Sequence, residues 1–71
     1  MSLHFKLMTD SDFQEVLDKQ VKVRVFKDNH IVDASSLIVR FDERLVVTQS
    51  GVSDLMYHNR GECEFFELRK R

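Results

Sequence analysis

The chain has 71 residues, and its 11 basic and 12 acidic side chains give a net charge of −1 at pH 7. A chain of this length forms one domain that buries only about 60 % of its unfolded surface, so its stability depends on support beyond a single core. The near-neutral charge excludes a general polyanion-binding surface, and any nucleic-acid site must therefore be local.

The amino-terminal segment predicts an arm and then a short helix. Residues 1–8, MSLHFKLM, are apolar and carry no turn signal; they are either an extended arm or the approach to a helix, and we assign them no regular structure. Ser11 and Gln14 have the spacing of a capping box, which predicts that a helix begins here and runs over residues 11–19. One apolar stripe follows at helical spacing: Phe13, Val16 and Leu17. Two helical turns are unstable alone in water, so we expect this stripe to cover one open end of a sheet.

Residues 20–68 carry the pattern of five antiparallel strands. Apolar and basic side chains alternate over VKVRV in the first strand, and only an extended backbone places such residues on opposite faces. Short polar turns separate the strands, as at Asp28 and Asn29 after the first and at residues 59–61 before the last. We therefore expect a strongly bent sheet that closes as a small barrel, because closure removes exposed strand edges, although closure of so small a barrel is often incomplete.

The second strand and the last two strands have features of their own. The second strand, HIVDASSLIVRF, carries small residues at positions 34–36, which predicts a bend within one continuous strand. The strands at residues 55–58 and 63–68 are interpreted as edges that pair with a neighbouring subunit in a head-to-tail ring. Such self-association would supply the burial that a small core lacks.

The composition indicates a reducing environment. A lone cysteine excludes a disulfide framework and favours a cytoplasmic location. The three histidines and this cysteine share no ligand spacing, so we expect no metal site. The chain has no run of about 20 apolar residues for a membrane span, and its amino terminus lacks a signal-type pattern.

The residues that could carry catalysis are better explained by the fold. Cys63 lies between Glu62 and Glu64, whose charges raise the pKa of a thiol, so we interpret it as a small buried apolar residue. Asp42 and Glu43 are interpreted as turn residues rather than as an acid and a base. We expect neither an enzymatic activity nor a cofactor.

Several short segments match a known pattern. They are FQEVL in the helix, VRVF and then Asn29 at the first turn, RFD with LVV two residues further on, and LMYHN in the fourth strand. With a bent second strand, this order of one helix and five strands resembles the Sm-like family, and within it the Hfq-type bacterial RNA chaperones. The resemblance covers roughly residues 11–68, with about one inserted residue in the second strand.

The resemblance implies an assembly and a ligand. Hfq-like proteins form six-membered homo-oligomeric rings in which the fourth strand pairs with the fifth strand of the next subunit. Their distal face binds single-stranded RNA, without catalysis, by stacking adenines on an aromatic side chain at the end of the first strand. Phe26 holds that position here, beside Lys22 and Arg24.

The proximal face of the family corresponds less well. Family members bind uridines there between an aromatic side chain and a Lys-His pair that follows a fourth-strand tyrosine. Tyr57 matches the tyrosine, but Arg44, His58 and Asn59 stand at the other three positions. A guanidinium can still stack on a base, and His58 and Asn59 can form hydrogen bonds, but the charge that anchors phosphate is reduced. The family's arginine-rich rim is represented by Lys19 alone.

Two of these groups have a structural explanation beside the functional one. From alternation alone, Phe26 either lies on the outer face with its basic neighbours or packs under the helix with Phe13. Residues 58–60 either line a ring pore or form a polar hairpin turn. The basic cluster at residues 69–71 is interpreted as a solvated chain end.

A second function class fits the same elements. A degenerate Sm-like or SH3-like barrel could serve as a protein adaptor or regulatory module, with the reduced charge reflecting loss of RNA contact. Its edge strands would then bind a segment of a protein partner by strand addition. The sequence predicts no membrane partner in either case.

Overall fold

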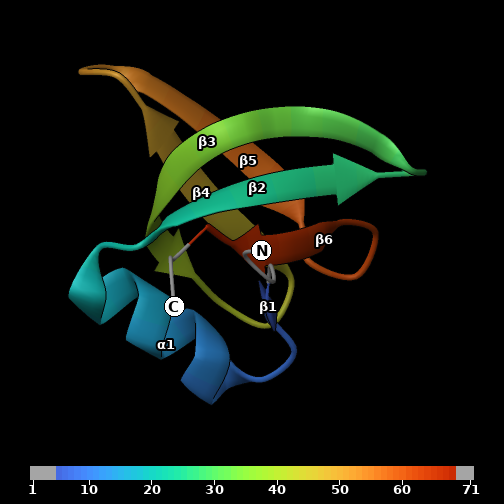
Figure 1. Ribbon diagram of the computed structural model, residues 1–71, viewed down its shortest axis with the longest axis horizontal. Coiled ribbons are helices and arrows are strands. Elements are labelled where there is room, and N and C mark those ends of the chain that lie inside the picture. The colour runs from blue at the N-terminus through green and yellow to red at the C-terminus, as the bar shows by residue number, and fades with distance from the viewer. Residues whose placement is uncertain (1–4, 69–71) are drawn as a thin grey trace.

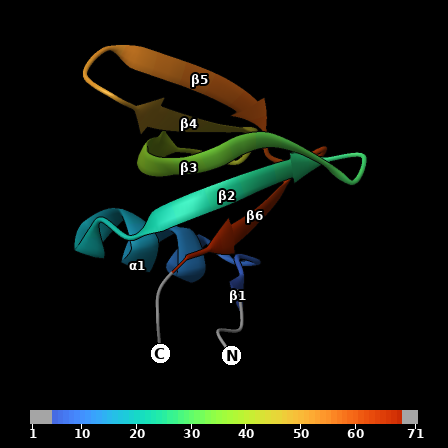
Figure 2. The same ribbon diagram turned by 45° about the horizontal axis from the view of Figure 1, so that its top comes forward.

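The computed structural model describes residues 5–68. These residues form one helix and six strands: β1 (Phe5–Lys6), α1 (Asp10–Lys19), β2 (Lys22–Lys27), β3 (His30–Phe41), β4 (Leu45–Ser50), β5 (Asp54–Asn59) and β6 (Glu64–Glu67). All six strands belong to one antiparallel sheet with the order β1-β6-β2-β3-β4-β5 (Figure 1). The sheet is strongly curved but open, because β1 and β5 stand at opposite edges (Figure 2).

The predicted mostly β class with one short helix is confirmed, but the sheet corrects two expectations. The strand β1 lies within the predicted arm of residues 1–8, where Phe5 pairs with Glu67 and Lys6 with Phe66. The sheet therefore has six strands rather than five, and it is not closed into a barrel. A two-residue strand carries no alternation signal of its own, since it forms only where another strand offers unpaired backbone groups. Residues 1–4 of the predicted arm and the basic cluster at residues 69–71 lie outside the described residues.

The start of α1 corrects the predicted capping box. Thr9, not Ser11, is the N-cap: its Oγ1 accepts a hydrogen bond from Asp12 N at 3.2 Å, and the Asp12 carboxylate accepts one from Thr9 N at 3.1 Å. Backbone N–H donors of Met8 and Thr9 lower the pKa of Asp12 below its ordinary 3.8. An aspartate thus takes the place that the usual box gives to glutamate or glutamine. The helix α1 has ten residues. Within residues 5–68, no helix is long and apolar enough to cross a membrane.

The predicted helical stripe packs on the sheet. Phe13 and Val16 are buried, and the Phe13 ring centroid lies 5.6 Å from that of Phe41 and 5.4 Å from that of Phe65. These contacts place α1 over the end of the sheet near β6, away from β5 (Figure 2). The buried apolar core joins the helix to four strands: Leu7, Phe13, Val16, Val23, Val25, Ile38, Val46 and Phe65.

The predicted bend in one continuous strand is confirmed in β3 (Figure 1). Val23 pairs with Ser36 and Val25 pairs with Asp33, so β3 has one residue more than β2 between these pairs. An extra residue of this kind is a β-bulge, which bends the strand and increases its twist. The small residues at positions 34–36 lie at this bulge. The preceding turn is also as predicted, with positive φ angles of 53° at Asp28 and 66° at Asn29.

Candidate nucleic-acid interface

The structure settles the position of Phe26. It lies on the outer face of β2, since the alternating residues Val23 and Val25 are fully buried on the other face. Its half-buried ring meets the ring of Phe66 on β6, with centroids 5.5 Å apart and planes at 85°. This edge-to-face contact fixes the orientation of Phe26. The alternative in which Phe26 packs with Phe13 under the helix is excluded.

Phe66 is the residue of this interface that sequence reasoning missed. The signal was present, because Phe65 and Phe66 are adjacent in an extended segment and must face opposite sides. Phe65 is buried in the core, which leaves Phe66 for the outer face. Without the register between β2 and β6, nothing in the sequence paired Phe66 with Phe26.

A surface hollow of about 300 Å³ lies at this aromatic pair and is lined by Phe26, Asn29, Glu64 and Phe66. Its volume is at the lower end of the range for small-molecule sites, about 300 to 1,000 Å³. The Glu64 carboxylate at its rim is paired with the Lys6 ammonium at 2.9 Å. The hollow therefore offers the apolar surface of two aromatic rings, one amide and a carboxylate whose charge is compensated.

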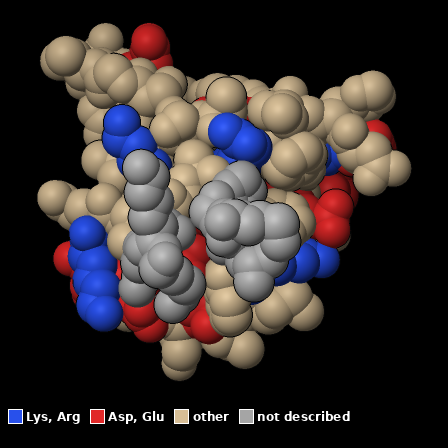
Figure 3. Space-filling view, viewed as in Figure 1, with Lys and Arg blue, Asp and Glu red and all other residues tan. Residues whose placement is uncertain are grey.

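The three residues predicted for a distal-type site share the outer face of β2. Lys22 is exposed, while the Arg24 Nε donates a hydrogen bond to the Ala34 carbonyl oxygen at 3.1 Å and so lies across the bulge of β3. On the face shown in Figure 3, basic and acidic side chains are scattered among larger uncharged areas. The basic character of the outer face is therefore local, as the net charge requires.

The four residues predicted for a proximal-type site are divided between two faces. Tyr57 is 61 % exposed on β5, Asn59 is exposed at the end of the same strand, and Arg44 is exposed at the turn before β4. His58, between Tyr57 and Asn59, is only 5 % exposed and faces the interior. The Asn59 Oδ1 accepts hydrogen bonds from the Gly61 and Glu62 N–H groups, which is the chemistry of a polar hairpin turn.

His58 belongs to a buried polar cluster with Asp33 and Thr48. The Thr48 hydroxyl donates to Asp33 Oδ2 at 3.0 Å and lies 3.0 Å from His58 Nε2. The Thr48 hydroxyl has one proton, and it uses this proton in the hydrogen bond to the Asp33 carboxylate. In the contact with His58 the hydroxyl oxygen is therefore the acceptor, and Nε2 carries a proton and donates. Desolvation lowers the pKa of His58 below 6.5, although the Asp33 carboxylate acts in the opposite direction. Thr48 is fully buried and its proton points away from the imidazole, so the cluster does not form an activated nucleophile.

Arg60 is likewise turned inward. Its guanidinium carbon lies 4.5 Å from the Phe13 ring centroid, its Nη1 donates to the Asp42 carbonyl oxygen at 2.9 Å, and its Nη2 lies 2.6 Å from Asp10 Oδ1. The side chain therefore ties the turn before β6 to α1 through a cation–π contact and an ion pair. These contacts support the turn interpretation of residues 58–60 over a pore.

Cys63 packs against the core from a half-buried position. Burial raises the pKa of its thiol above the ordinary 9.0, and Glu62 acts in the same direction. The thiolate, which is the reactive form, is thus disfavoured. Within residues 5–68, histidine, cysteine, aspartate and glutamate side chains form no group of three suited to a metal ion.

The outer face of β2 is therefore the surface on which the predicted residues and an apolar hollow coincide. Interpreting this surface as a nucleic-acid interface depends on this geometry and on the Sm-like resemblance of residues 11–68. Comparisons of the chain with models of protein families, with curated proteins and with solved structures found no match.

Proposed function

We propose that this chain is an Sm-like, Hfq-like protein that binds single-stranded RNA on the outer face of β2, without catalysis. The single observation that carries the proposal is the Phe26–Phe66 pair, which forms an apolar hollow on the same face as Lys22 and Arg24. Single-stranded nucleic acids are bound where aromatic side chains alternate with basic ones, because rings stack on bases and cations meet phosphates. The helix followed by five strands, with the second one bent, supports the Sm-like interpretation.

The roles of the side chains follow from their positions. Phe26 provides the stacking surface, and Phe66 holds its ring in place. Asn29, at the tip of the adjacent turn, offers an amide that can both donate to and accept from a base edge. Arg24 and Lys22 lie further along the strand, where they can approach the backbone of the same RNA strand.

The test is the affinity of the Phe26→Ala variant for an A-rich oligonucleotide, measured by fluorescence anisotropy at fixed salt. One stacked base contributes about 1 to 3 kcal/mol, so we expect the dissociation constant to rise by about 5-fold to 150-fold. Phe5→Ala is the matched control, because Phe5 is exposed and pairs with Glu67, on the opposite face from Phe66. Equal affinities of Phe26→Ala and the unsubstituted protein, or no affinity in either, would exclude this function.

The exposed edge strand β5 favours the adaptor as a second candidate. Leu55, Met56 and Tyr57 are exposed along it, and an open edge is a template for strand addition. The absorbance ratio of the purified protein at 260 and 280 nm separates the two candidates. Co-purified nucleic acid supports RNA binding, whereas a clean protein spectrum favours the adaptor.

A further inference from the structure

The edge strand β5 carries none of the features that normally keep such a strand from pairing. Soluble proteins protect sheet edges with prolines, lysines, bulges or very short strands. The segment DLMYHN of β5 has six residues without proline or lysine, and its register with β4 runs from Leu45 to Ser50 without a bulge. The opposite edge is protected, because β1 has only two residues and one of them is Lys6. Within residues 5–68, β5 is therefore the edge that is open to a further strand.

The backbone of β5 alternates between groups that bond to β4 and groups that point away from the sheet. The Arg60 N–H donates to the Arg44 carbonyl oxygen at 2.7 Å, one residue pair beyond the end of the β4–β5 register. Because bonded and non-bonded pairs alternate in an antiparallel ladder, the N–H and C=O groups of residues 55, 57 and 59 point outward. The Asn59 carbonyl oxygen already accepts from two N–H groups of the following turn. Leu55 and Tyr57 therefore offer two donors and two acceptors at the open edge.

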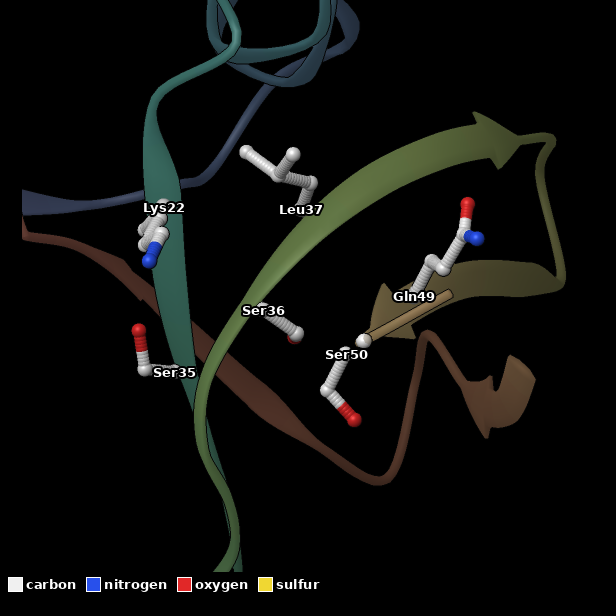
Figure 4. A pocket seen from close by; sticks show the side chains of 7 residues that line it. Lys22, Ser35, Ser36, Leu37, Gln49 and Ser50 are labelled. Carbon is white, nitrogen blue, oxygen red and sulfur yellow. The ribbon is translucent and has the colours of Figure 1, made fainter. Parts of the chain in front are cut away.

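The side chains of β5 are divided between the two faces of the sheet. One row of register pairs crosses the outer face from β2 to β5: Lys22, Leu37, Gln49 and Leu55. Leu37 and Gln49 line a hollow of about 380 Å³ and extend to the same side of the sheet (Figure 4). Leu55 and Tyr57 thus lie on the outer face, while Met56 lies on the inner one. All three side chains are exposed, so a strand added to β5 would cover apolar surface on both faces.

We propose that β5 pairs with β5 of a second copy of this chain, antiparallel and related by a two-fold axis at Met56. In this register Leu55 of each copy lies opposite Tyr57 of the other, and their outward N–H and C=O groups form four hydrogen bonds. Met56 lies opposite Met56 of the second copy as a non-hydrogen-bonded pair. The interface is isologous, and it joins two six-stranded sheets into one.

The hydrogen-bonding pattern selects this register among the two-fold alternatives. An axis between two residues would oppose outward groups with groups that are already bonded to β4. An axis at Tyr57 would use the occupied carbonyl oxygen of Asn59. An axis at Leu55 would place Tyr57 opposite Ser53, which precedes the strand. The axis at Met56 uses only groups that are free at the edge.

Two further features favour β5 of a second copy as the partner. The carboxylate of Asp54 lies opposite His58 of the second copy rather than opposite its own equivalent, so the pairing opposes no like charges. Pairing of β5 with β6 of another copy, as in a ring, lacks a free edge, because β6 already pairs with β2 on one side and with β1 on the other. The two-fold dimer needs no such rearrangement.

Disulfide formation tests the position of the axis. Cα atoms of a non-hydrogen-bonded pair lie about 4.5 Å apart, within the range of a disulfide, so Met56→Cys in a Cys63→Ala background is expected to form a covalent dimer with oxidised glutathione. Asp54→Cys in the same background is the matched control, since Asp54 is also exposed on β5 but lies about 13 Å along the strand from its equivalent. No disulfide in Met56→Cys, or equally fast formation in Asp54→Cys, overturns the pairing.

Native mass spectrometry over the micromolar range tests the backbone contacts. Leu55→Pro and Leu55→Ala both lack the leucine side chain, but only the proline also lacks the N–H group and so removes two hydrogen bonds per dimer. We expect the dissociation constant of the dimer to be at least about 5-fold higher in Leu55→Pro than in Leu55→Ala. Proline is tolerated on an edge strand where its nitrogen faces outward, so the two monomers should unfold at similar temperatures. Equal dissociation constants, monomer alone or a six-copy mass would contradict the proposal.

Both experiments are made without RNA, so their outcome is independent of the proposed function. A dimer without affinity for oligonucleotides removes the RNA function and leaves the β5 interface in place. An RNA-binding monomer does the reverse.

Discussion

A single hydroxyl, that of Thr48, contacts both Asp33 and His58 and determines that the ring nitrogen Nε2 of His58 is the protonated one. It lies 3.0 Å from a carboxylate oxygen and 3.0 Å from an imidazole nitrogen, and it donates its one hydrogen bond to Asp33. The neutral form of His58 is favoured by desolvation, which lowers its pKa below 6.5 against the opposing effect of the Asp33 carboxylate. A histidine that looked like a surface contact from its place after Tyr57 thus acts as part of the core.

The buried His58 predicts a pH dependence of stability. Its pKa in the folded chain lies below the ordinary 6.5, so the unfolded chain binds more protons as the pH falls through this value. The free energy of unfolding is thus highest above about pH 6.5 and decreases on acidification, by about 1.4 kcal/mol for each unit by which the two pKa values differ. Urea denaturation from about pH 8 to about pH 5 measures this slope.

The variant His58→Gln isolates this effect, since its amide can still donate to Thr48 but does not titrate. It is expected to flatten the slope, and His30→Gln, which replaces an exposed histidine, is the matched control. Asp12 and Asp42, whose pKa values are lowered by backbone N–H donors, lose their contribution only as the pH falls below their ordinary 3.8. A slope that persists unchanged in His58→Gln would assign the pH dependence to other groups.

At the scale of the element, α1 shows which local signals decide a helix boundary. Ser11 with Gln14 and Thr9 with Asp12 both have capping spacing, and the carboxylate of Asp12 decides between them by accepting from two backbone N–H groups. The predicted stripe of Phe13 and Val16 is independent of this choice, because it depends only on helical periodicity. The element was therefore predictable, and its first residue was not.

The two candidate caps make opposite predictions for alanine substitution. Thr9→Ala removes the acceptor of the Asp12 N–H and is expected to lower the free energy of unfolding by about 0.5 to 2 kcal/mol. Ser11→Ala replaces an exposed residue inside α1 by a better helix former and should be neutral or slightly stabilising. Urea denaturation of both variants provides the comparison. If Ser11→Ala were the more destabilising of the two, the cap at Thr9 would be wrong.

The whole molecule has two unequal sheet edges. At one edge β1 pairs with Phe66 and Glu67, and the Leu7 N–H donates to the Phe65 carbonyl oxygen at 2.8 Å, so β6 is covered over much of its length. At the other edge β5 has no second pairing strand among residues 5–68 and exposes apolar side chains. The expected ring, in which β5 meets β6 of the next subunit, would require the two-residue strand β1 to release that edge.

Assembly through β5 is a prediction that native mass spectrometry can test. We expect homo-oligomers at micromolar concentration, and we expect Leu55→Lys to shift them toward monomer because a lysine on an edge strand opposes strand pairing. Val52→Lys serves as the control, since Val52 is 96 % exposed in the turn before β5. Monomer alone throughout the micromolar range would rule out the ring and leave the β2 surface to act in a single subunit.

Local periodicity determined much of this protein. The alternation along β2 placed Lys22 and Arg24 on the face opposite Val23 and Val25, because a side-chain period of two is a property of any extended backbone, although it left the position of Phe26 open. Small residues likewise predicted the bend of β3, since they allow close approach and sharp curvature wherever they occur. Both features depend on neighbours in the chain and needed no knowledge of the rest of the fold.

Only the tertiary structure decided which side chains contact each other across the sheet. Strand register brought Phe66 to Phe26, turned His58 toward Asp33 and Thr48, and left the buried Ser36 hydroxyl without a hydrogen-bond partner within residues 5–68. It also placed β1 on the edge that the sequence had left for a second subunit. These contacts join residues far apart in the chain, and a shift of one residue in register would move each side chain to the other face.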